Sequence, residues 1–355
     1  MQHELLRYSC QLALPGFNEA SQQQLQSAKV LIVGMGGLGS PAAQYLVATG
    51  VGTIGIADFD IVSISNLHRQ ILYSPADVGL KKVVVASKKL QQQNSDTCLI
   101  QHDVKITSEN VMEIILPYEI VVDCTDNFDA KYLLNDACVL TGKPLVYGAI
   151  YQYEGQVAVW NILNSDGTRT PNYRDLFPSV NSTQVPDCAE GGVMPTLAGI
   201  IGCMQANEVI KYLTKTGDLL AGKILMFDAQ TMQSRIIKLG SITKTKITAL
   251  TGTVAQPVIS ANDLKEAIHK NVYELIDVRT LEEHNSFNIG GRNFPVNELE
   301  NNISYPDNGK TLVLYCSSGK RSGEAVKLLK NKFPDINIFS LEGGLKAWKE
   351  DVDAK

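Results

Sequence analysis

The sequence lacks the features of a membrane or secreted protein. None of its apolar runs approaches the roughly 20 residues that a helix needs to cross a bilayer. The N-terminal stretch, MQHELLRYSC, has neither the basic region nor the apolar region of a signal peptide. Long runs of like charge are also missing, and the formal net charge is -5 over 355 residues. These absences predict a cytoplasmic protein that binds neither membranes nor nucleic acid.

Paired cysteines are missing as well. The seven cysteines are odd in number and widely spaced, with no CxxC pair, so we expect thiols in a reducing compartment and no disulfide framework. Four of them lie in strand or helix patterns and are predicted to be small core residues. These four are Cys98, Cys124, Cys138 and Cys203. The others are Cys10, Cys188 and Cys316.

The first part of the chain alternates between strand and helix patterns. A strand, KVLIV, starts at Lys29 and is followed by a glycine-rich turn and an apolar-periodic helix over 38–49. Further short apolar runs lie at 53–57, 119–123 and 144–148, with room between them for crossover helices. This pattern predicts an α/β fold with a doubly wound, mostly parallel, Rossmann-like sheet.

The length of the chain and its later segments predict two domains. A polar span over 161–193 is interpreted as a lid or crossover loop, and a helix over about 195–213 and the strands KILMFDA and SRIIKL follow it. We expect the first domain to be 1–240 and the linker to be 241–256. The strands YELIDV and TLVLYC then predict a second, smaller α/β domain over 257–355.

The turn after the first strand has the pattern of a phosphate-binding loop. The stretch GMGGLG at 34–39 fits GxGxxG and lies between a strand and a helix, whose N-terminal N–H groups favour anions. Asp58, at the end of the second strand, is placed to accept from ribose hydroxyls. Taken alone, the motif favours a nicotinamide- or flavin-dependent dehydrogenase. The glycines predicted to contact the nucleotide are Gly34, Gly36, Gly37 and Gly39.

Polar and cationic residues beyond this motif favour a different reaction. Asn66, Arg69 and Gln70 follow Asp58 closely, and Lys82 opens the next predicted helix. An enzyme that splits a triphosphate has to neutralise charge on the departing pyrophosphate, which a dehydrogenase does not.

Asp126 is the candidate metal ligand. It lies in VVDCTDN, just past the carboxyl end of a strand, where open α/β sheets bind their ligands. We interpret it as a magnesium ligand. The alternative is that Asp126 caps the helix from Phe128 onward.

Together these segments resemble the MoeB/ThiF family, the bacterial relatives of ubiquitin-activating enzymes, over about residues 4–240. The matching stretches are LRYS, VLIVGMGGLGS, DFDIVSISNLHRQ, DCTDN, EGQVAVW and CAEGGVMP. The resemblance implies a homodimer that binds ATP and Mg²⁺ and attaches AMP to the C-terminal Gly-Gly of a small ubiquitin-like sulfur carrier. Residues implied to line the ATP site are Asp58, Asp60, Asn66, Arg69, Gln70, Lys82, Asp126 and Asn127.

Three positions in this part need separate comment. Cys188, in PDCAEGG, matches a cysteine on the family's crossover loop that can attack the acyl-adenylate or relay sulfur, and the alternative is an incidental loop cysteine. Many members carry zinc on two CxxC pairs, but Asn172 and Asp175 stand at the first pair, so we expect no structural zinc. Cys10 replaces an arginine that reaches ATP from the partner subunit in the family, which predicts slower adenylation, although Arg7 is retained nearby.

The second domain carries its own candidate site. The strand TLVLY runs into CSSGKRS and then a helix, so the turn and the helix N-terminus aim N–H groups at one point. Together with the two basic side chains, this setting should stabilise a thiolate or a persulfide, whose outer sulfur is transferable. The predicted sulfur loop is Cys316, Ser317, Ser318, Gly319, Lys320 and Arg321.

Three stretches here resemble rhodanese sulfurtransferases over about residues 257–350. They are IDVRTLEEHNSFNIGG, CSSGKRS and LEGGLKAW. The alternative is a phosphatase of related fold, which usually needs one more residue between its cysteine and arginine. Asp277 and Arg279 match an early DxR element and are interpreted as a brace for the loop, whereas Gly343, Gly344 and Trp348 look like packing of the final helix.

The two resemblances imply one sequence of reactions. The carrier carboxylate, of a MoaD- or ThiS-like protein from molybdopterin or thiazole synthesis, is adenylated, and sulfur from a Cys316 persulfide then forms a thiocarboxylate. The sulfur source would be thiosulfate or a cysteine desulfurase. The catalytic residues implied are Cys316, Cys188, Arg69 and Asp126. Alternatives are an NAD-dependent oxidoreductase and an inactive scaffold. A third alternative is a tRNA-modifying relative, but the attached sulfur domain argues against it.

Overall fold

The chain forms two compact units. The computed structural model describes residues 6–178, 191–250, 257–267, 270, 272–296, 298–299, 310–333 and 335–353. Unit 1 comprises the described residues up to 250, and unit 2 comprises those from 257 onward. No helix in these described ranges is long and apolar enough to cross a membrane.

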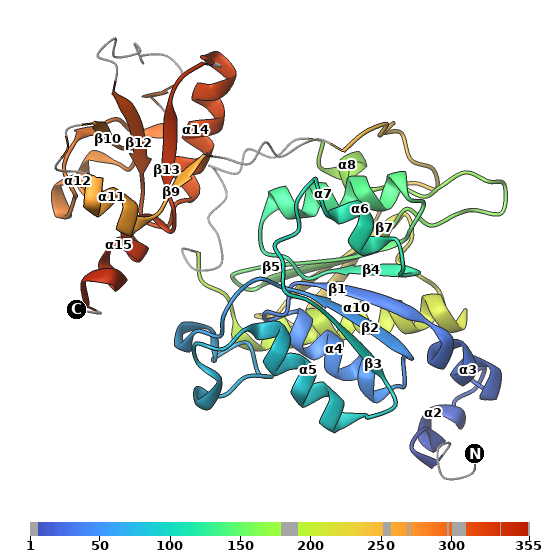
Figure 1. Cartoon of the computed structure of the whole chain (residues 1–355). Coiled ribbons are helices and arrows are strands. Elements are labelled where there is room, and N and C mark those ends of the chain that lie inside the picture. The colour runs from blue at the N-terminus through green and yellow to red at the C-terminus, as the bar shows by residue number, and fades with distance from the viewer. Residues whose placement is uncertain are drawn as a thin grey trace. The chain divides into compact units, whose positions relative to one another are not determined.

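An eight-stranded sheet forms the centre of unit 1, in the order β3-β2-β1-β4-β5-β6-β7-β8 (Figure 1). The strands from β1 to β5 are parallel, and β6, β7 and β8 each run antiparallel to the preceding strand. This topology confirms the predicted doubly wound, mostly parallel, Rossmann-like fold. The strands are β1 Lys29–Val33, β2 Thr53–Ala57, β3 Cys98–His102, β4 Ile120–Asp123, β5 Leu145–Tyr151, β6 Glu154–Trp160, β7 Lys223–Asp228 and β8 Gln233–Lys238.

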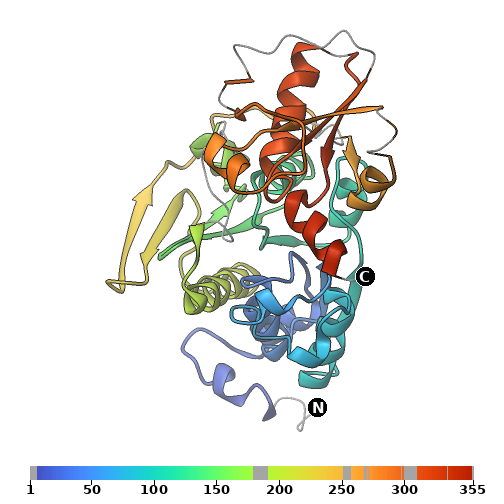
Figure 2. The same ribbon diagram turned by 90° about the vertical axis from the view of Figure 1, so that its left-hand side faces the viewer.

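Helices cover both faces of this sheet (Figures 1 and 2). One core packs α3, α4, α5 and α10 against the sheet, and a second core packs α6, α7 and α8 against the other face. Burial on both faces explains why the central strands read as continuous apolar runs. The helices are α2 Ser9–Leu12, α3 Glu19–Ser27, α4 Gly39–Ala48, α5 Lys82–Gln93, α6 Val111–Ile115, α7 Phe128–Leu140, α8 Tyr173–Leu176 and α10 Pro195–Thr214.

The cysteine predictions are correct in part. Cys124 and Cys138 are buried as predicted, and burial raises the pKa of both thiols. The prediction is wrong for Cys98, which is exposed, because β3 pairs only with β2 and lies at the edge of the sheet. Cys203 is partly exposed on α10.

Part of the span predicted to be a loop packs against the core of unit 1. Tyr173 is buried and makes ring contacts with Tyr132, Tyr147 and Phe177, at centroid distances of 4.9–5.3 Å. Tyr173, Leu176 and Phe177 therefore anchor α8 to the core of unit 1. Residues 179–190 lie outside the described part of the chain.

Unit 2 is built on a five-stranded parallel sheet in the order β11-β10-β12-β13-β9. Its strands are β9 Val258–Ile259, β10 Tyr273–Asp277, β11 Arg292–Asn293, β12 Thr311–Tyr315 and β13 Ile338–Leu341. Two separate cores cover its faces, one including side chains of α14 and the other including side chains of α11 and α15. The helices are α11 Ala261–Ala267, α12 Leu281–Ser286, α14 Lys320–Lys332 and α15 Gly344–Asp353.

Candidate functional sites

The glycine-rich turn of unit 1 connects β1 to α4. Gly34 has a φ of 92°, and a Cβ there would lie 2.7 Å from the Cys124 carbonyl oxygen, so only glycine fits without strain. A Cβ on Gly39 would overlap the Gly34 carbonyl oxygen. The backbone therefore folds back on itself and directs the α4 N-terminus at the carboxyl ends of the strands, a geometry that favours anions.

Asp58 holds this turn in place. Its Oδ2 accepts from Met35 N at 2.7 Å and its Oδ1 accepts from Asp60 N at 2.8 Å. Tyr73 donates to the Met35 carbonyl at 2.8 Å from the other side. Burial raises the pKa of the Asp58 carboxyl, although the Lys82 cation opposes that rise. Asp58 thus braces the turn, and its remaining lone pairs can still accept from a ribose.

Two cations lie beside the turn, and each is held by one predicted site residue. Lys82 is buried at the start of α5, and its Nζ donates to Asp60 Oδ2 at 2.9 Å. The Arg69 guanidinium donates to Asn66 Oδ1 at 2.9 Å. Both cations are thus positioned by short side chains that a phosphate could displace.

Near the turn, the buried side-chain amide of Gln70 is the strongest candidate for a ligand contact. Its side chain is only 5% exposed, and its Oε1 has no hydrogen-bond partner among the described residues. The amide nitrogen lies 3.4 Å from where a Cβ on Gly36 would be, so the amide faces the turn. A buried amide oxygen without a donor is costly, so this atom is available to a hydrogen-bond donor that enters the site.

In the loop after β4, Asp126 and Asn127 have different roles. Asn127 Oδ1 accepts from Ala130 N at 2.9 Å and caps α7, so the alternative that Asp126 is the cap is wrong. Asp126 itself is exposed. Its carboxylate is therefore available to a cation at the carboxyl end of β4.

A buried network beneath this loop was not predicted from the sequence. Lys131 Nζ donates to Asp123 Oδ2 at 3.1 Å and to the Gly148 carbonyl at 2.8 Å. Thr125 donates to Asp123 Oδ1 through its N–H and its hydroxyl. Gln205, from α10, donates to the Asp123 carbonyl at 2.7 Å. These hydrogen bonds anchor the backbone around Asp126 to three elements, α7, β5 and α10.

Cys10 and Arg7 of the described chain do not join this cluster. Cys188 lies outside the described residues. Cys10 is exposed on α2, and Arg7 donates to the Gln93 carbonyl at 3.1 Å, at the C-terminal end of α5. Lys82 stands at the opposite end of that helix, so Arg7 does not reach the turn of its own chain.

In unit 2 the sulfur loop lies between β12 and α14. Cys316 is buried, and its Sγ accepts from Ser322 N at 3.4 Å and from the Ser322 hydroxyl at 3.6 Å. The N-terminus of α15 also binds the loop, because Leu345 N donates to the Cys316 carbonyl and Lys346 N to the Ser317 carbonyl. A Cβ on Gly344 would clash with this loop. The LEGG segment therefore supports the loop directly and does more than pack the final helix.

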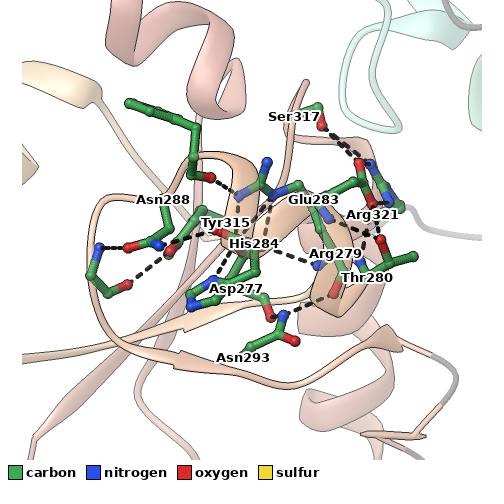
Figure 3. Close-up of polar contacts among 12 residues, drawn as sticks. Asp277, Arg279, Thr280, Glu283, His284, Asn288, Asn293, Tyr315, Ser317 and Arg321 are labelled. Atoms are coloured by element: carbon green, nitrogen blue, oxygen red, sulfur yellow. Dashed lines mark hydrogen bonds and ion pairs between the residues drawn. The ribbon is translucent and has the colours of Figure 1, made fainter.

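Glu283 clamps the other side of the loop (Figure 3). Its two carboxylate oxygens accept from the Arg321 guanidinium at 2.7 and 2.8 Å, and Arg321 also donates to the Ser317 hydroxyl at 3.2 Å. The hydrogen bond from Arg321 lowers the pKa of Glu283 to about 2, although burial opposes it. Sequence analysis did not identify Glu283 as a site residue. The only sequence feature that could have indicated it is its position four residues after Arg279.

The DxR element forms a rigid support behind α12 (Figure 3). Arg279 binds Asp277 through Nε at 2.9 Å and Nη2 at 2.6 Å, and it donates to the Phe287 carbonyl at 2.6 Å. His284 Nδ1 lies 2.9 Å from Asp277 Oδ2. Although burial would raise the pKa of Asp277, the hydrogen bonds from Arg279 and His284 lower it. These residues hold the helix that carries Glu283.

Comparisons with known proteins agree with this two-part arrangement. The ThiF family model matches residues 8–248, and the rhodanese-like domain model matches residues 260–351. The "Adenylyltransferase and sulfurtransferase MOCS3" of Drosophila grimshawi is 36% identical, with 99% of this chain and 85% of that protein covered. The "Sulfur carrier protein adenylyltransferase" of Thermus thermophilus is 49% identical, covering 64% of this chain and 84% of that protein. E. coli MccB with MccA-N7isoASN has a similar fold, with a TM-score of 0.59 at 20% identity over 65% of this chain and 71% of that chain.

Proposed function

The chain belongs to the ThiF family, and from that premise we propose that it is an enzyme that adenylates a small sulfur-carrier protein and then supplies it with sulfur. The observation that carries this proposal is the presence of two prepared sites in one chain. One is a glycine turn with two cations beside it, and the other is a cysteine loop held by an ion pair. The full-length similarity to a protein named for both activities supports the same conclusion.

In the first reaction, the carboxylate of the carrier's C-terminal Gly-Gly attacks the α-phosphorus of ATP, and pyrophosphate leaves. Arg69 and Lys82 would exchange their hydrogen bonds to Asn66 and Asp60 for hydrogen bonds to phosphate oxygens. In that position they would stabilise the negative charge on the leaving pyrophosphate. Gln70 offers its amide to the nucleotide over the turn.

Magnesium is the metal that fits this site. The exposed carboxylate of Asp126 is a hard oxygen ligand at the carboxyl end of β4, and one carboxylate together with substrate phosphates is how Mg²⁺ is usually held. The ion would neutralise charge on the phosphates. Asp123 and Lys131 keep the backbone of this loop fixed.

In the second reaction, the outer sulfur of a Cys316 persulfide attacks the acyl carbon, and AMP leaves. A thiol, either Cys188 or an external one, attacks the Cys316 sulfur of the resulting acyl disulfide. The S–S bond breaks, the carrier thiocarboxylate leaves, and the disulfide formed between Cys316 and the attacking thiol is then reduced by an external thiol reductant. Cys316 is buried, so the added sulfur, about 2 Å beyond Sγ, is the atom that reaches the carrier. Thiosulfate or a cysteine desulfurase would load Cys316.

The experiment combines pyrophosphate exchange with mass spectrometry of the carrier. Purified chain, ATP, Mg²⁺ and a MoaD- or ThiS-like carrier should show exchange, and adding thiosulfate and a reductant should add the mass of a thiocarboxylate. Cys316→Ala should keep exchange and lose the thiocarboxylate, whereas Cys98→Ala, the matched control on the edge strand, should keep both. Absence of exchange with every carrier would contradict adenylation. If the chain binds NAD and not ATP, the oxidoreductase alternative is favoured.

A homodimer is part of this proposal. Several large apolar side chains between β2 and α5 are more than 40% exposed, which is typical of an interface. They are Phe59, Ile61, Ile64, Ile71, Val78 and Leu80. Light scattering should give twice the mass of one chain, and Ile64→Asp should shift it toward the monomer.

A further inference from the structure

Two buried hydroxyl groups lie behind the Cys316 sulfur. Ser322 comes from the first turn of α14 and is 0% exposed, and Ser340 comes from β13 and is 2% exposed. Their Oγ atoms lie 2.8 Å apart, and either one can be the donor. Ser322 contacts the sulfur directly, whereas Ser340 reaches it only through Ser322.

The hydrogen atoms available here are fewer than the acceptors. The two hydroxyls supply two protons, and the acceptors are the Cys316 sulfur, the Gly319 carbonyl and the oxygen of the other hydroxyl. The Gly319 carbonyl lies 3.1 Å from the Ser322 Oγ and 3.4 Å from the Ser340 Oγ, and it already accepts from Gly323 N. The single hydroxyl proton of Ser322 can therefore go to only one of three acceptors: this carbonyl, the Ser340 oxygen, or the sulfur at 3.6 Å.

We propose that Ser340 is a positioning residue for sulfur transfer: it donates its proton to the Ser322 oxygen or to the Gly319 carbonyl, and so frees the Ser322 proton for a negatively charged Cys316 sulfur. This inference rests on the proposed sulfurtransferase function. Without Ser340, the Ser322 hydroxyl would turn to the closer carbonyl, and the thiolate would lose its side-chain donor. The Ser322 N–H would still contact the sulfur.

An adjustable donor suits this reaction, because the charge on the sulfur changes at each step. The Cys316 thiolate attacks the outer sulfur of thiosulfate, the S–S bond of thiosulfate breaks, and sulfite leaves with that bond's electron pair. The negative charge then resides on the outer sulfur of the persulfide. When a nucleophile such as cyanide removes that outer sulfur as thiocyanate, the charge returns to the Cys316 sulfur. Two coupled hydroxyls can follow these changes by rotation alone.

The ion pair between Arg321 and Glu283 does not replace this role. Arg321 of α14 and Glu283 of α12 are bound to each other and to the Ser317 hydroxyl, on the side of the loop that faces α12. Lys320 begins α14. The only hydrogen bonds to the Cys316 sulfur within the described part of unit 2 come from Ser322.

The test is the pH profile of thiosulfate:cyanide sulfur transfer by the full chain. We expect Ser340→Ala to lower kcat/KM near neutral pH by about tenfold, the typical effect of losing a hydrogen bond to a charged group. The profile should also move to higher pH, because the thiolate is less stabilised. Ser322→Ala should give the same shift, and the double variant should be no slower than Ser322→Ala, since Ser340 acts through Ser322.

Controls separate this role from simple packing. Thr311→Val removes a hydroxyl at the other end of β12, where it accepts from Asn337, and should leave the profile unchanged. Ser340→Thr keeps a hydroxyl and should retain the wild-type profile. A Ser340→Ala chain with an unshifted profile, or a double variant whose losses add, would overturn the inference alone. A wild-type chain that forms neither thiocyanate nor a persulfide detectable by mass would overturn the proposed function and this inference with it.

Discussion

At the scale of single residues, Glu283 makes the stability of unit 2 depend on pH. Its pKa is lowered from an ordinary value of 4.5 to about 2, so its stabilising effect is present above pH 4.5 and is lost as pH falls toward 2. Because the pair with Arg321 is partly exposed, screening limits the effect to about 1 kcal/mol. We expect Glu283→Gln to unfold at lower temperature near neutral pH and to show a flatter acid dependence.

Thermal unfolding at a series of pH values measures this effect. The matched control is Glu282→Gln, which changes the exposed neighbour on the same helix and should keep the wild-type dependence. An acid dependence of Glu283→Gln as steep as that of the wild type would show that the pair with Arg321 adds no stability.

The sequence could identify single residues that stand in motifs but not those that meet through the fold. Gly34 follows β1, Asp58 follows β2 and Lys82 begins α5, which are the places in the elements that the sequence predicted. Lys131 and Ser340 were missed, because a lysine in a helix and a serine in a strand are ordinary until the packing places them beside Asp123 and Ser322. Such contacts depend on the relative placement of elements, which periodicity does not encode.

At the scale of elements, the close approach of α10 to α4 supports the nucleotide turn. A Cβ on Gly202 would overlap the Leu38 carbonyl oxygen, whereas a Cβ on Gly199, one turn earlier on α10, would meet nothing within 4 Å. We expect Gly202→Ala to lower the free energy of unfolding by about 1–3 kcal/mol and to weaken ATP binding, because α4 must move. Gly199→Ala should raise stability by up to about 1 kcal/mol.

Chemical denaturation and ATP titration calorimetry check this pair. Both variants add one methyl group to the same helix, so a difference between them reports the contact with α4 and excludes helix propensity as its cause. Equal stability and equal ATP affinity of the two variants would contradict this account.

The Asp175 carboxylate makes most of the hydrogen bonds that hold the segment after β8 to α8. Asp175 accepts from the Thr243 hydroxyl at 2.6 Å, from Lys244 N at 2.8 Å, and from the N–H and the hydroxyl of Thr245, both at 2.8 Å. Burial would raise the pKa of Asp175, but these hydrogen bonds lower it. We expect Asp175→Ala to destabilise unit 1 by about 1–3 kcal/mol.

Thermal unfolding measures the effect of Asp175→Ala, and it also tests the prediction that no structural zinc is present. Asn172 and Asp175 bind each other and Thr243 in place of cysteines, so a chelator should leave the melting temperature unchanged. Asp166→Ala, an exposed loop carboxylate that caps its own turn, is the matched control for Asp175→Ala. A chelator that lowers the melting temperature would indicate a bound metal.

Elements were predictable from the sequence where apolar runs are long, and not where strands are short or at an edge. β1, β2, β4 and α10 lie close to their predicted bounds because they are buried and strongly patterned. β3 was missed, because an edge strand exposes alternate and even adjacent residues. The two-residue strands β9 and β11 offer too few positions for any period to be visible.

At the scale of the whole molecule, separate cores should make the chain unfold in two steps. The two cores of unit 1 and the two of unit 2 share no residue, and the chain divides between the units near residue 252. Each unit buries its own apolar side chains, so neither core needs the other to exclude water. We therefore expect scanning calorimetry of the full chain to show two transitions.

Ligands and mutations should move these transitions separately. ATP with Mg²⁺ at about a hundred times its dissociation constant should stabilise unit 1 by about 2.7 kcal/mol, which raises its transition by several degrees and leaves the other unchanged. Glu283→Gln should lower only the transition of unit 2, because its ion pair lies wholly within that unit. A single transition that responds to both changes would show that the two units unfold as one. Adenylation in unit 1 and sulfur transfer in unit 2 would then depend on cores whose stabilities are coupled.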